Sequence, residues 1–266
     1  VTLTGDTLTL NQATTRGGGV NNFGLMTVSG TLLSHNTAVD GGAIATARSL
    51  DVSDSVFSDN AATDDGGAIY NDELGVVTID RTVFQDNTAL DDGGAVANRD
   101  TGDMVLAFSD LTGNSAGSDG GAVHNTSSTG LTLASSLVYN NESDGSGGGL
   151  ANESIGSATV VNTTFSGNRS ATGGAVANQG DLQMTHSTIY QNESVDGGGI
   201  SNAPTVPDVL AIRNTIVANN TATGSGSDLF GSGYQSDGYN LIGNIGTDAS
   251  IIASFGSTDM VGTPAS

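Results

Sequence analysis

Aspartate is the residue type in this sequence whose spacing suggests chemistry. It stands directly before a Gly-Gly pair at several places, two of them doubled: Asp40, Asp64, Asp65, Asp91, Asp92, Asp119 and Asp196. If equivalent residues stack about 4.8 Å apart, their carboxylates repel by roughly 0.9 kcal/mol per pair even at the dielectric of water. A bound Ca²⁺, which prefers oxygen ligands, would relieve that repulsion. The alternative is that Asp simply favours the turn before Gly.

A second set of polar residues shares one position of a repeat. His35, Asp59 and Asp86 each stand one residue before a recurring Asn. Stacking would place the Asp59 and Asp86 carboxylates roughly 5 Å apart, which suits a shared cation, the carboxylate pair of a retaining glycosidase, or a plain solvated turn. We assign no catalytic residue. The candidate metal ligands are Asp40, Asp59, Asp64, Asp65, Asp86, Asp91, Asp92 and Asp119.

Composition limits the partners and the chemistry. The 266 residues carry 28 acidic and 6 basic side chains, a formal net charge of −22, and every basic residue is Arg. This charge opposes binding to nucleic acid or to an anionic membrane. The absence of Cys excludes disulfides and thiolate metal sites, and no apolar run is long enough to predict a membrane span. The chain opens at Val1 without an apolar leader, which suggests a processed or excised part of a secreted protein.

A repeat of about 26 residues organises the chain. Its Gly-Gly pairs begin at Gly17, Gly41, Gly66, Gly93, Gly120, Gly147, Gly173 and Gly197. A first Asn column follows them, at Asn22, Asn71, Asn98, Asn125, Asn152, Asn178 and Asn202, with Thr46 as the exception. A second column comprises Asn36, Asn60, Asn87, Asn114, Asn141, Asn168, Asn192 and Asn220. Such regular columns indicate one structural unit per repeat.

Further columns precede the second Asn. Apolar residues stand three and eight positions before it, and Ser or Thr stands five before it, as in Phe84, Ile79 and Thr82 before Asn87. The apolar positions alternate over short β-branched runs cut by Gly and Asn, which is typical of strands and turns. Stacked in parallel, such units predict an all-β, single-domain parallel β-helix (β-solenoid) of about eight coils.

The stacked geometry predicts a role for each column. Apolar columns fill the core, Asn columns form ladders at bends where Asn accepts left-handed backbone, and Gly-Gly permits positive φ. Residues four before the second Asn, such as Leu32, Val56 and Leu137, either face outward as a flat stripe for a partner or form a second core strand. We expect the core strand.

The repeat also divides the chain. Residues 1–16 are expected to form a partial opening coil, residues 17–223 the β-helix repeats, and residues 224–266 a C-terminal capping segment. The residues expected to cover the last coil are Phe230, Tyr234, Tyr239, Leu241 and Phe255. No comparable cap is evident at the N-terminus, where preceding sequence or a neighbouring subunit is expected.

The motifs Gly-Gly-Ala-Ile/Val-x-Asn and Phe-x-x-Asn, as in Gly66–Asn71 and Phe84–Asn87, resemble the repeats of polymorphic outer-membrane proteins and related bacterial right-handed β-helix surface proteins. The segment Asp237–Asn244 is similar to the closing segment of large secreted repeat proteins that carry a cell-surface anchor. Together the similarity covers nearly the whole chain. It implies a right-handed coil, export and display at the cell surface.

Two classes of function remain open. The regular columns favour a non-enzymatic extracellular or cell-surface scaffold, adhesin-like or a subunit of a surface assembly. Its partner would be a cell-surface or matrix component, or copies of itself, and Ca²⁺ is the one cofactor suggested. The alternative is a β-helix polysaccharide lyase or glycoside hydrolase, whose cleft would need acidic and basic groups together. The six Arg residues are scattered among the columns, which disfavours that alternative.

Overall fold

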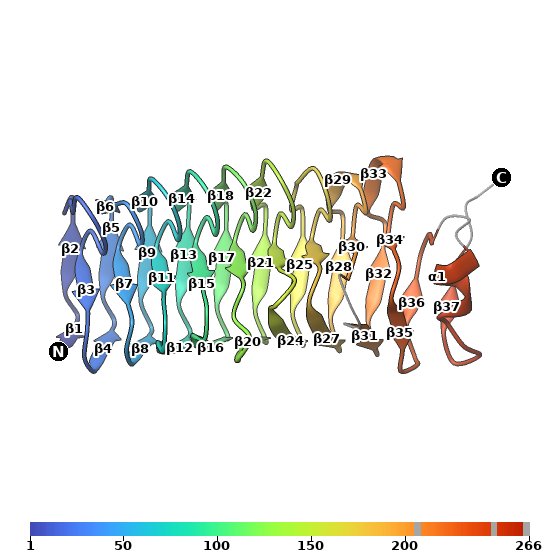
Figure 1. Ribbon diagram of the computed structural model, residues 1–266, viewed down its shortest axis with the longest axis horizontal. Coiled ribbons are helices and arrows are strands. Elements are labelled where there is room, and N and C mark those ends of the chain that lie inside the picture. Colours follow the sequence, from blue (N-terminus) through green and yellow to red (C-terminus); the bar gives the residue numbers. More distant parts are fainter. Residues whose placement is uncertain (205–208, 246–248, 263–266) are drawn as a thin grey trace.

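Each repeat folds into one coil of short strands, and the coils stack along a common axis (Figure 1). The structure is a computed structural model that describes residues 1–204, 209–245 and 249–262. Strands at the same position of successive coils pair in parallel, so that each sheet runs along the molecule. The result is an all-β parallel solenoid, as the repeat predicted, with about nine turns where about eight coils were expected.

Three long sheets and a short fourth side enclose the core. The ten-stranded sheet contains β1 (Thr2–Thr4), β4 (Met26–Ser29), β8 (Leu50–Ser53), β12 (Val76–Asp80), β16 (Asp103–Ala107), β20 (Gly130–Ala134), β24 (Ser157–Val161), β27 (Asp181–Thr185), β31 (Leu210–Arg213) and β35 (Tyr234–Ser236). The eleven-stranded sheet contains β2 (Thr7–Thr9), β5 (Leu32–Ser34), β9 (Val56–Ser58), β13 (Val83–Gln85), β17 (Asp110–Thr112), β21 (Leu137–Tyr139), β25 (Thr164–Ser166), β28 (Thr188–Tyr190), β32 (Ile216–Ala218), β36 (Leu241–Ile242) and β37 (Met260–Val261).

The remaining strands complete each coil. The nine-stranded sheet contains β3 (Val20–Asn22), β7 (Ile44–Thr46), β11 (Ile69–Asn71), β15 (Val96–Asn98), β19 (Val123–Asn125), β23 (Leu150–Asn152), β26 (Val176–Asn178), β30 (Ile200–Asn202) and β34 (Leu229–Gly231). The fourth side contains β6 (Thr37–Ala38), β10 (Ala61–Ala62), β14 (Thr88–Ala89), β18 (Ser115–Ala116) and β22 (Glu142–Ser143), then β29 (Glu193–Asp196) and β33 (Thr221–Ser225).

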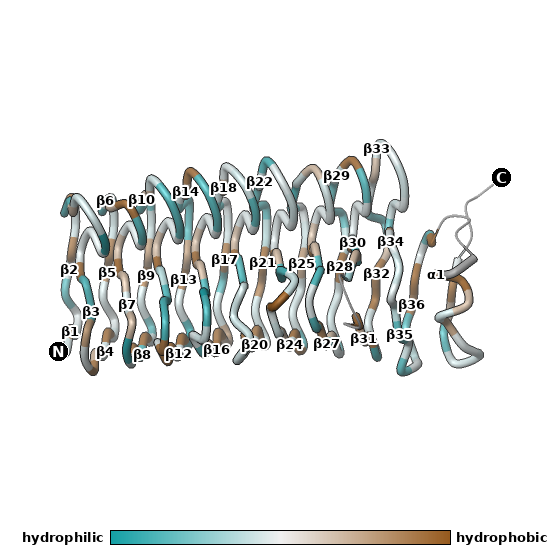
Figure 2. The backbone as a smooth tube through the Cα atoms, viewed as in Figure 1, coloured by the Kyte–Doolittle hydropathy of each residue, from teal (hydrophilic) through white to brown (hydrophobic). Residues whose placement is uncertain are grey.

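The core is built from the two predicted apolar columns before the second Asn and from a third in the strand after each Gly-Gly pair. Ile79, Phe84 and Val96, one from each long sheet, are all fully buried, and their equivalents in other coils form one continuous cluster with them. Apolar segments recur at matching places in successive coils (Figure 2). Phe57 stacks on Phe84, with ring centroids 5.0 Å apart. Like side chains therefore lie on like side chains along the axis, which confirms the column assignment.

Both Asn columns form hydrogen-bonded ladders inside the coils. In the second column the Nδ2 atom of Asn87 donates to Oδ1 of Asn114 at 2.9 Å, and the same atom of Asn114 donates to Asn141 at 2.9 Å. Each Asn backbone N–H also donates to the next Oδ1, as Asn87 does to Asn114 at 3.0 Å. Buried amides are thus satisfied from coil to coil, as buried polar groups must be.

The exception in the first Asn column leaves a visible defect. Thr46 accepts a hydrogen bond from Nδ2 of Asn22 at 3.0 Å but donates its own hydroxyl to the backbone carbonyl of Arg48. Consequently Oδ1 of Asn71, in the next coil, is buried without a hydrogen-bond partner. An Asn in place of Thr46 would supply the missing donor.

The prediction that the Asn columns take left-handed backbone is wrong. The residue before each second-column Asn is left-handed instead, with φ between 53° and 60° at His35, Asp59, Asp86, Asn140, Gln191 and Asn219, while Gly113 and Gly167 occupy the same position in other coils. A parallel left-handed column, which includes Asp54 and Arg81, precedes the Ser/Thr column. The bend is made by the preceding residue because the Asn side chain must point inward to join its ladder. The first Gly of each Gly-Gly pair makes a further corner, as predicted, with φ near 65° at Gly66 and its equivalents.

Strand pairing continues past residue 223 to the C-terminal end of the described chain. Strands β34, β35 and β36 extend the three long sheets, and α1 (Ala249–Ala253) follows them at the end of the molecule (Figure 1). Ile245 and Ile251 are buried and Phe255 packs on the core, whereas Tyr239 and Leu241 are exposed. The end of the core is therefore covered by α1 and its neighbours.

Candidate functional site

The Asp column before Gly-Gly brings carboxylates together as predicted. One carboxylate oxygen from each of Asp40, Asp64 and Asp65 lies within 4.8 Å of the other two, and Asp65, Asp91 and Asp92 form a second such group. Asp40 and Asp65 are buried, while Asp64 and Asp91 are exposed. We call these the two acidic triads. Their oxygens are close enough together to share a Ca²⁺ ion.

The other predicted ligands lie outside the triads. Asp119 is next in the column, and its backbone N–H donates to Oδ1 of Asp92 at 2.9 Å. Asp59 and Asp86 occupy a different corner of the coil, between the eleven-stranded sheet and the fourth side, where both are exposed. Within the described residues these two belong to no group of three or more potential metal ligands. The structure therefore separates the eight candidates into two places.

Two arginines are paired with the acidic column. Arg16 contacts Asp40 through Nε at 3.0 Å and also Asp72, with its guanidinium 5.1 Å from the centroid of the Tyr70 ring. Arg99 donates from Nη2 to Asp65 at 2.5 Å and to Asp92 at 2.9 Å. The prediction that the Arg residues are scattered is thus wrong for these two. Each neutralises part of the repulsion that suggested a cation.

Burial still perturbs the protonation of this region. Loss of solvent raises the pKa of the Asp65 carboxyl to about 6, although the neighbouring Arg99 opposes that rise. Desolvation also raises the pKa of Asp119, against a hydrogen bond from the backbone of Ser146. A raised carboxyl pKa means that the folded protein disfavours the charged form. The acidic column is therefore only partly compensated by its arginines.

A shallow pocket continues the column beyond Arg99. Its volume is about 420 Å³, and Asp92, Arg99, Asp119, His124 and Glu153 line it. His124 is 2% exposed, with Nε2 3.5 Å from Asp92 and Nδ1 without a hydrogen-bond partner. Burial lowers the pKa of His124 to about 4 and raises that of Glu153. The imidazole is consequently neutral at pH 7 despite its acidic surroundings.

Sequence reasoning missed Arg16, Asp72, Arg99 and Glu153, although the repeat contains the signal. Arg16 stands before Gly17 at the head of the Asp column, and its backbone bridges to Asp40. Asp72, Arg99 and Glu153 each directly follow an Asn of the first ladder. Aligning the repeats at the position after the first Asn would have placed Asp72, Arg99 and Glu153 in one charged column beside the acidic column.

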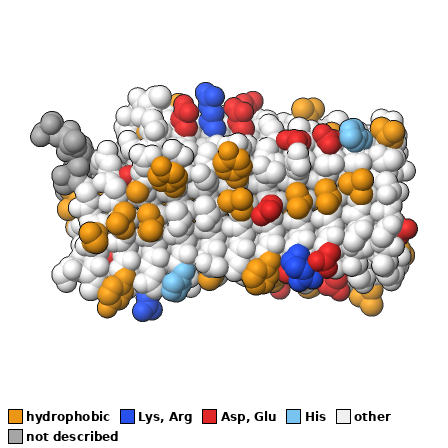
Figure 3. All heavy atoms as spheres, turned by 180° about the vertical axis from the view of Figure 1, so that it is seen from behind, with side chains coloured by type: hydrophobic (Ala, Val, Ile, Leu, Met, Phe, Trp, Pro, Cys, Tyr) orange, Lys and Arg blue, Asp and Glu red, His pale blue; other side chains and the backbone are white. Residues whose placement is uncertain are grey.

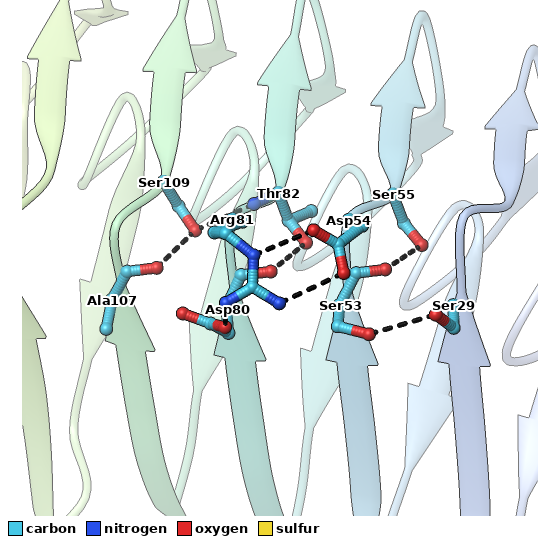
Figure 4. Close-up of polar contacts among 9 residues, drawn as sticks. All are labelled: Ser29, Ser53, Asp54, Ser55, Asp80, Arg81, Thr82, Ala107 and Ser109. Carbon is cyan, nitrogen blue, oxygen red and sulfur yellow. Dashed lines mark hydrogen bonds and ion pairs between the residues drawn. The ribbon is translucent and has the colours of Figure 1, made fainter.

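A separate ion-pair group lies at the corner between the ten-stranded and eleven-stranded sheets (Figure 4). Arg81 donates to both oxygens of Asp54, at 2.7 and 3.0 Å, and also contacts Asp80. These hydrogen bonds hold the pKa of Asp54 below its usual value. Beside them the Ser/Thr column forms a third ladder, in which the Thr82 N–H donates to the Ser109 hydroxyl at 3.0 Å. All these groups satisfy one another, which indicates a structural role.

The stripe expected to form a second core strand faces outward instead. Leu32, Val56, Leu137 and Ile216 are between 36% and 43% exposed, because strand alternation points them away from the buried column that contains Phe57. Figure 3 looks onto this face and shows hydrophobic side chains gathered along a line, with an acidic one among them. We call it the flat face: the outer side of the eleven-stranded sheet.

Comparison with known proteins identifies one repeat. Residues 54–72 match the model of the Chlamydia polymorphic membrane protein (Chlamydia_PMP) repeat. This stretch contains both motifs, Phe57–Asn60 and Gly66–Asn71. Searches of curated proteins and of solved structures gave no significant match.

The fold, the ladders and this match together define the class of the protein. It is a parallel β-helix repeat protein, and its residues 54–72 are similar to the polymorphic membrane protein repeat. In general terms, the match points to a protein associated with the cell surface or outer membrane. No helix among the described residues is long and apolar enough to cross a bilayer.

Proposed function

We propose that the chain is a non-enzymatic extracellular scaffold with an adhesin-like role, and that the flat face is its contact surface. The observation that carries this proposal is the outward apolar row on that face. Leu32, Val56, Leu137, Ile216 and Leu241 are 36% to 43% exposed, and Met260, paired with Leu241 at the C-terminal end of the row, is 69% exposed. Exposed apolar groups arranged in a continuous patch are typical of interaction sites.

The fold itself does not require apolar residues in this row. Asp110, Thr164 and Thr188 occupy the same column in other coils and pair in register with their apolar neighbours. A position that accepts Asp and Thr is not a packing position, so Leu and Ile there are best explained by contact with a partner. The partner we favour is a component of another cell surface or of a matrix, and copies of the chain are the second possibility.

A charge substitution on the flat face tests this function. Val56→Lys combined with Leu137→Lys should reduce binding of the labelled protein to intact cells or matrix-coated wells by about tenfold or more, because two ammonium groups would be placed in the contact. The control is Val76→Lys combined with Val105→Lys, which adds the same charge to exposed positions on the ten-stranded sheet. Equal loss in both variants, or no binding by the parent protein to any such surface, would overturn the proposal.

The non-enzymatic part of the proposal is supported by the repeat match and has its own test. Neutral and acidic polysaccharides are incubated with the protein and assayed for new reducing ends and for unsaturated products. We expect no turnover. Turnover that Asp59→Asn abolishes would establish the competing assignment of a polysaccharide lyase or glycoside hydrolase.

Ca²⁺ binding at the acidic triads is retained as a proposal about the scaffold. The close approach of three carboxylate oxygens in each triad supports it, while the ion pairs of Arg16 and Arg99 reduce the charge that an ion would neutralise. Because both triads include Asp65, binding in one affects the other. The expected consequence is a higher melting temperature in Ca²⁺ than in chelator.

A further inference from the structure

We propose that the flat face carries a binding site for a neutral saccharide, formed around Tyr139, Gly167 and Gln191. The proposal rests on the adhesin-like function above and names the chemistry of its partner. The site is a pocket of about 390 Å³ at the edge of the eleven-stranded sheet. This volume lies within the range of small-molecule sites in proteins.

Tyr139 lines the pocket, and Tyr190 offers a second exposed ring outside its lining. Tyr139 and Tyr190 occupy the same column two coils apart, with Ser166 between them in register. Two coils correspond to roughly 10 Å along the axis, about the length of two pyranose rings in an extended chain. Both side chains are exposed, 42% and 41%. The C–H faces of a pyranose ring pack on aromatic rings, whereas its hydroxyls need polar partners.

One coil has no side chain at the corner beside the pocket. The left-handed position before the second Asn holds Asn140 and Gln191 in the flanking coils but Gly167 between them. A Cβ atom at Gly167 would lie 2.3 Å from Oδ1 of Asn140 and 3.4 Å from the ring of Tyr139. Glycine thus allows the Asn140 amide to lie over this corner, where it lines the pocket together with Gln191.

The side chains around the hollow offer both donors and acceptors. Asn140, Gln191 and Glu193 line it, and no described residue forms a hydrogen bond or ion pair with their side-chain atoms. Amides donate and accept, and a carboxylate accepts two hydrogen bonds, which together match vicinal hydroxyl groups. Aromatic faces next to open amide and carboxylate groups are the chemistry that a saccharide requires.

Charge selects a neutral ligand rather than an acidic one. No Arg or His lines the pocket, whose one ionisable carboxylate is Glu193, and the chain carries a net charge of −22. A uronate or sulfate group would meet like charge there, and the neighbouring cation, Arg169, is flanked by two carboxylates because its backbone pairs with Glu142 and Glu193. The source of the saccharide is either a free polysaccharide or a glycan attached to a protein.

Native affinity electrophoresis of the full chain tests the site. The gels contain a neutral β-glucan, a galactomannan, a high-mannose glycoprotein with or without enzymatic removal of its glycans, or polygalacturonate as the acidic control. We expect retardation in at least one neutral gel and none in polygalacturonate. Retardation that depends on the glycoprotein's glycans would assign a protein-borne source, and retardation in a polysaccharide gel would assign a free one.

Variants within the same columns provide matched controls. Tyr139→Ser and Tyr190→Ser, which introduce the residue found at Ser166 in that column, should each weaken binding about fivefold. Gly167→Asn should abolish it, because the new side chain would displace the Asn140 amide that lines the pocket, at a left-handed position that already accepts Asn in the neighbouring coil. Gly113→Asn makes the same change two coils earlier and outside the pocket, where a Cβ would lie 2.3 Å from Oδ1 of Asp86, and should leave binding unchanged.

The outcomes separate this site from the adhesin-like function. Loss of retardation in Gly167→Asn but not in Gly113→Asn, with unchanged circular dichroism, would support the site. No retardation of the parent protein in any neutral gel, or equal behaviour of the two Gly variants, would overturn it. If cell binding persisted in Gly167→Asn and still required Val56 and Leu137, the flat face would remain the contact surface without a saccharide site.

Discussion

Asn114 tests the energetic role of the buried ladder. Its side chain is fully buried and makes four hydrogen bonds: Oδ1 accepts from the backbone N–H and from Nδ2 of Asn87, while Nδ2 donates to Asn141 Oδ1 and to the carbonyl of Phe84. Asn114→Ala deletes all four. The backbone N–H of Asn87 and one of its two amide N–H groups would then be buried without a partner, while the other amide N–H keeps its bond to the carbonyl of Phe57.

The expected loss follows from those orphaned groups. A buried donor left unsatisfied costs about 1–3 kcal/mol, so the two donors of Asn87 predict a loss of roughly 2–6 kcal/mol in the free energy of unfolding. Whole domains are stable by only about 5–15 kcal/mol. A single ladder substitution should therefore remove a large fraction of the stability of the coils around it.

Urea denaturation followed by circular dichroism measures this loss through the shift of the midpoint. Asn21→Ala is the control, because Asn21 is an exposed Asn in β3 for which no side-chain hydrogen bond is seen among the described residues. It should change the free energy of unfolding by no more than about 0.5 kcal/mol. A loss below about 0.5 kcal/mol for Asn114→Ala, equal to the control, would refute the reasoning.

Three further predictions concern particular groups. Thr46→Asn should raise the free energy of unfolding by about 1 kcal/mol, measured in urea, because the new amide donates to the orphaned Oδ1 of Asn71; a destabilised variant would contradict the ladder model. Acidification from pH 7 to 4.5 should act oppositely on two groups. His124, whose pKa is lowered to about 4 in the folded protein, binds a proton more readily in the unfolded chain, so its contribution to the free energy of unfolding falls as the pH drops below 6.5. Asp65, whose pKa is raised to about 6, binds a proton more readily in the folded protein, so its contribution rises over the same range. Urea titrations at both pH values should therefore show that, compared with the parent protein, His124→Gln gains stability on acidification to pH 4.5 and Asp65→Asn loses it. A change in the same direction in both variants would disprove this assignment. Finally, Arg99→Gln should lower the melting temperature at pH 7, because Asp65 and Asp92 lose their counter-charge. Millimolar Ca²⁺ should then raise the melting temperature more in this variant than in the parent protein. An equal rise in both would contradict cation binding at the triads.

The core columns and the two Asn ladders could be predicted from the sequence because a single alignment of the repeats places all of them. Once Asn87 and Asn114 are taken as equivalent, Phe84 must lie beside Leu111 and Val83 beside Asp110, as the strand pairing has them. Side chains of like type then meet in every coil. This is why the core and both ladders followed from spacing alone.

The outward direction of Val56 was available from the same pattern but was predicted wrongly. Phe57 belongs to the core, and successive side chains of a strand point to opposite faces, so its neighbour had to face solvent. The left-handed residues at Asp54 and Asp59 confine that strand to three residues. The bends were assigned to the Asn columns, and this error led to the expectation of a second core strand.

The charged contacts could be predicted less well because they depend on side-chain reach. Arg99 meets Asp65, 34 residues earlier in the chain, by extending its guanidinium across the coil boundary. A column comparison gives the positions of Cα atoms but not the rotamer of a long side chain. The burial of His124 beside Asp92 likewise depends on the loops that cover the nine-stranded sheet, which have irregular sequences.

The neighbour relation between equivalent residues is the claim on which the ladders, the flat face and the saccharide site all depend. The chain has no Cys, so pairs can be introduced on an empty background. Val56→Cys with Val83→Cys joins positions that are paired in adjacent strands, whereas Val56→Cys with Asp110→Cys joins positions two coils apart, roughly 10 Å and beyond the reach of a disulfide. Mild oxidation followed by mass spectrometry should show an intramolecular disulfide in the first variant and free thiols in the second. The reverse result would contradict the stacking of the coils.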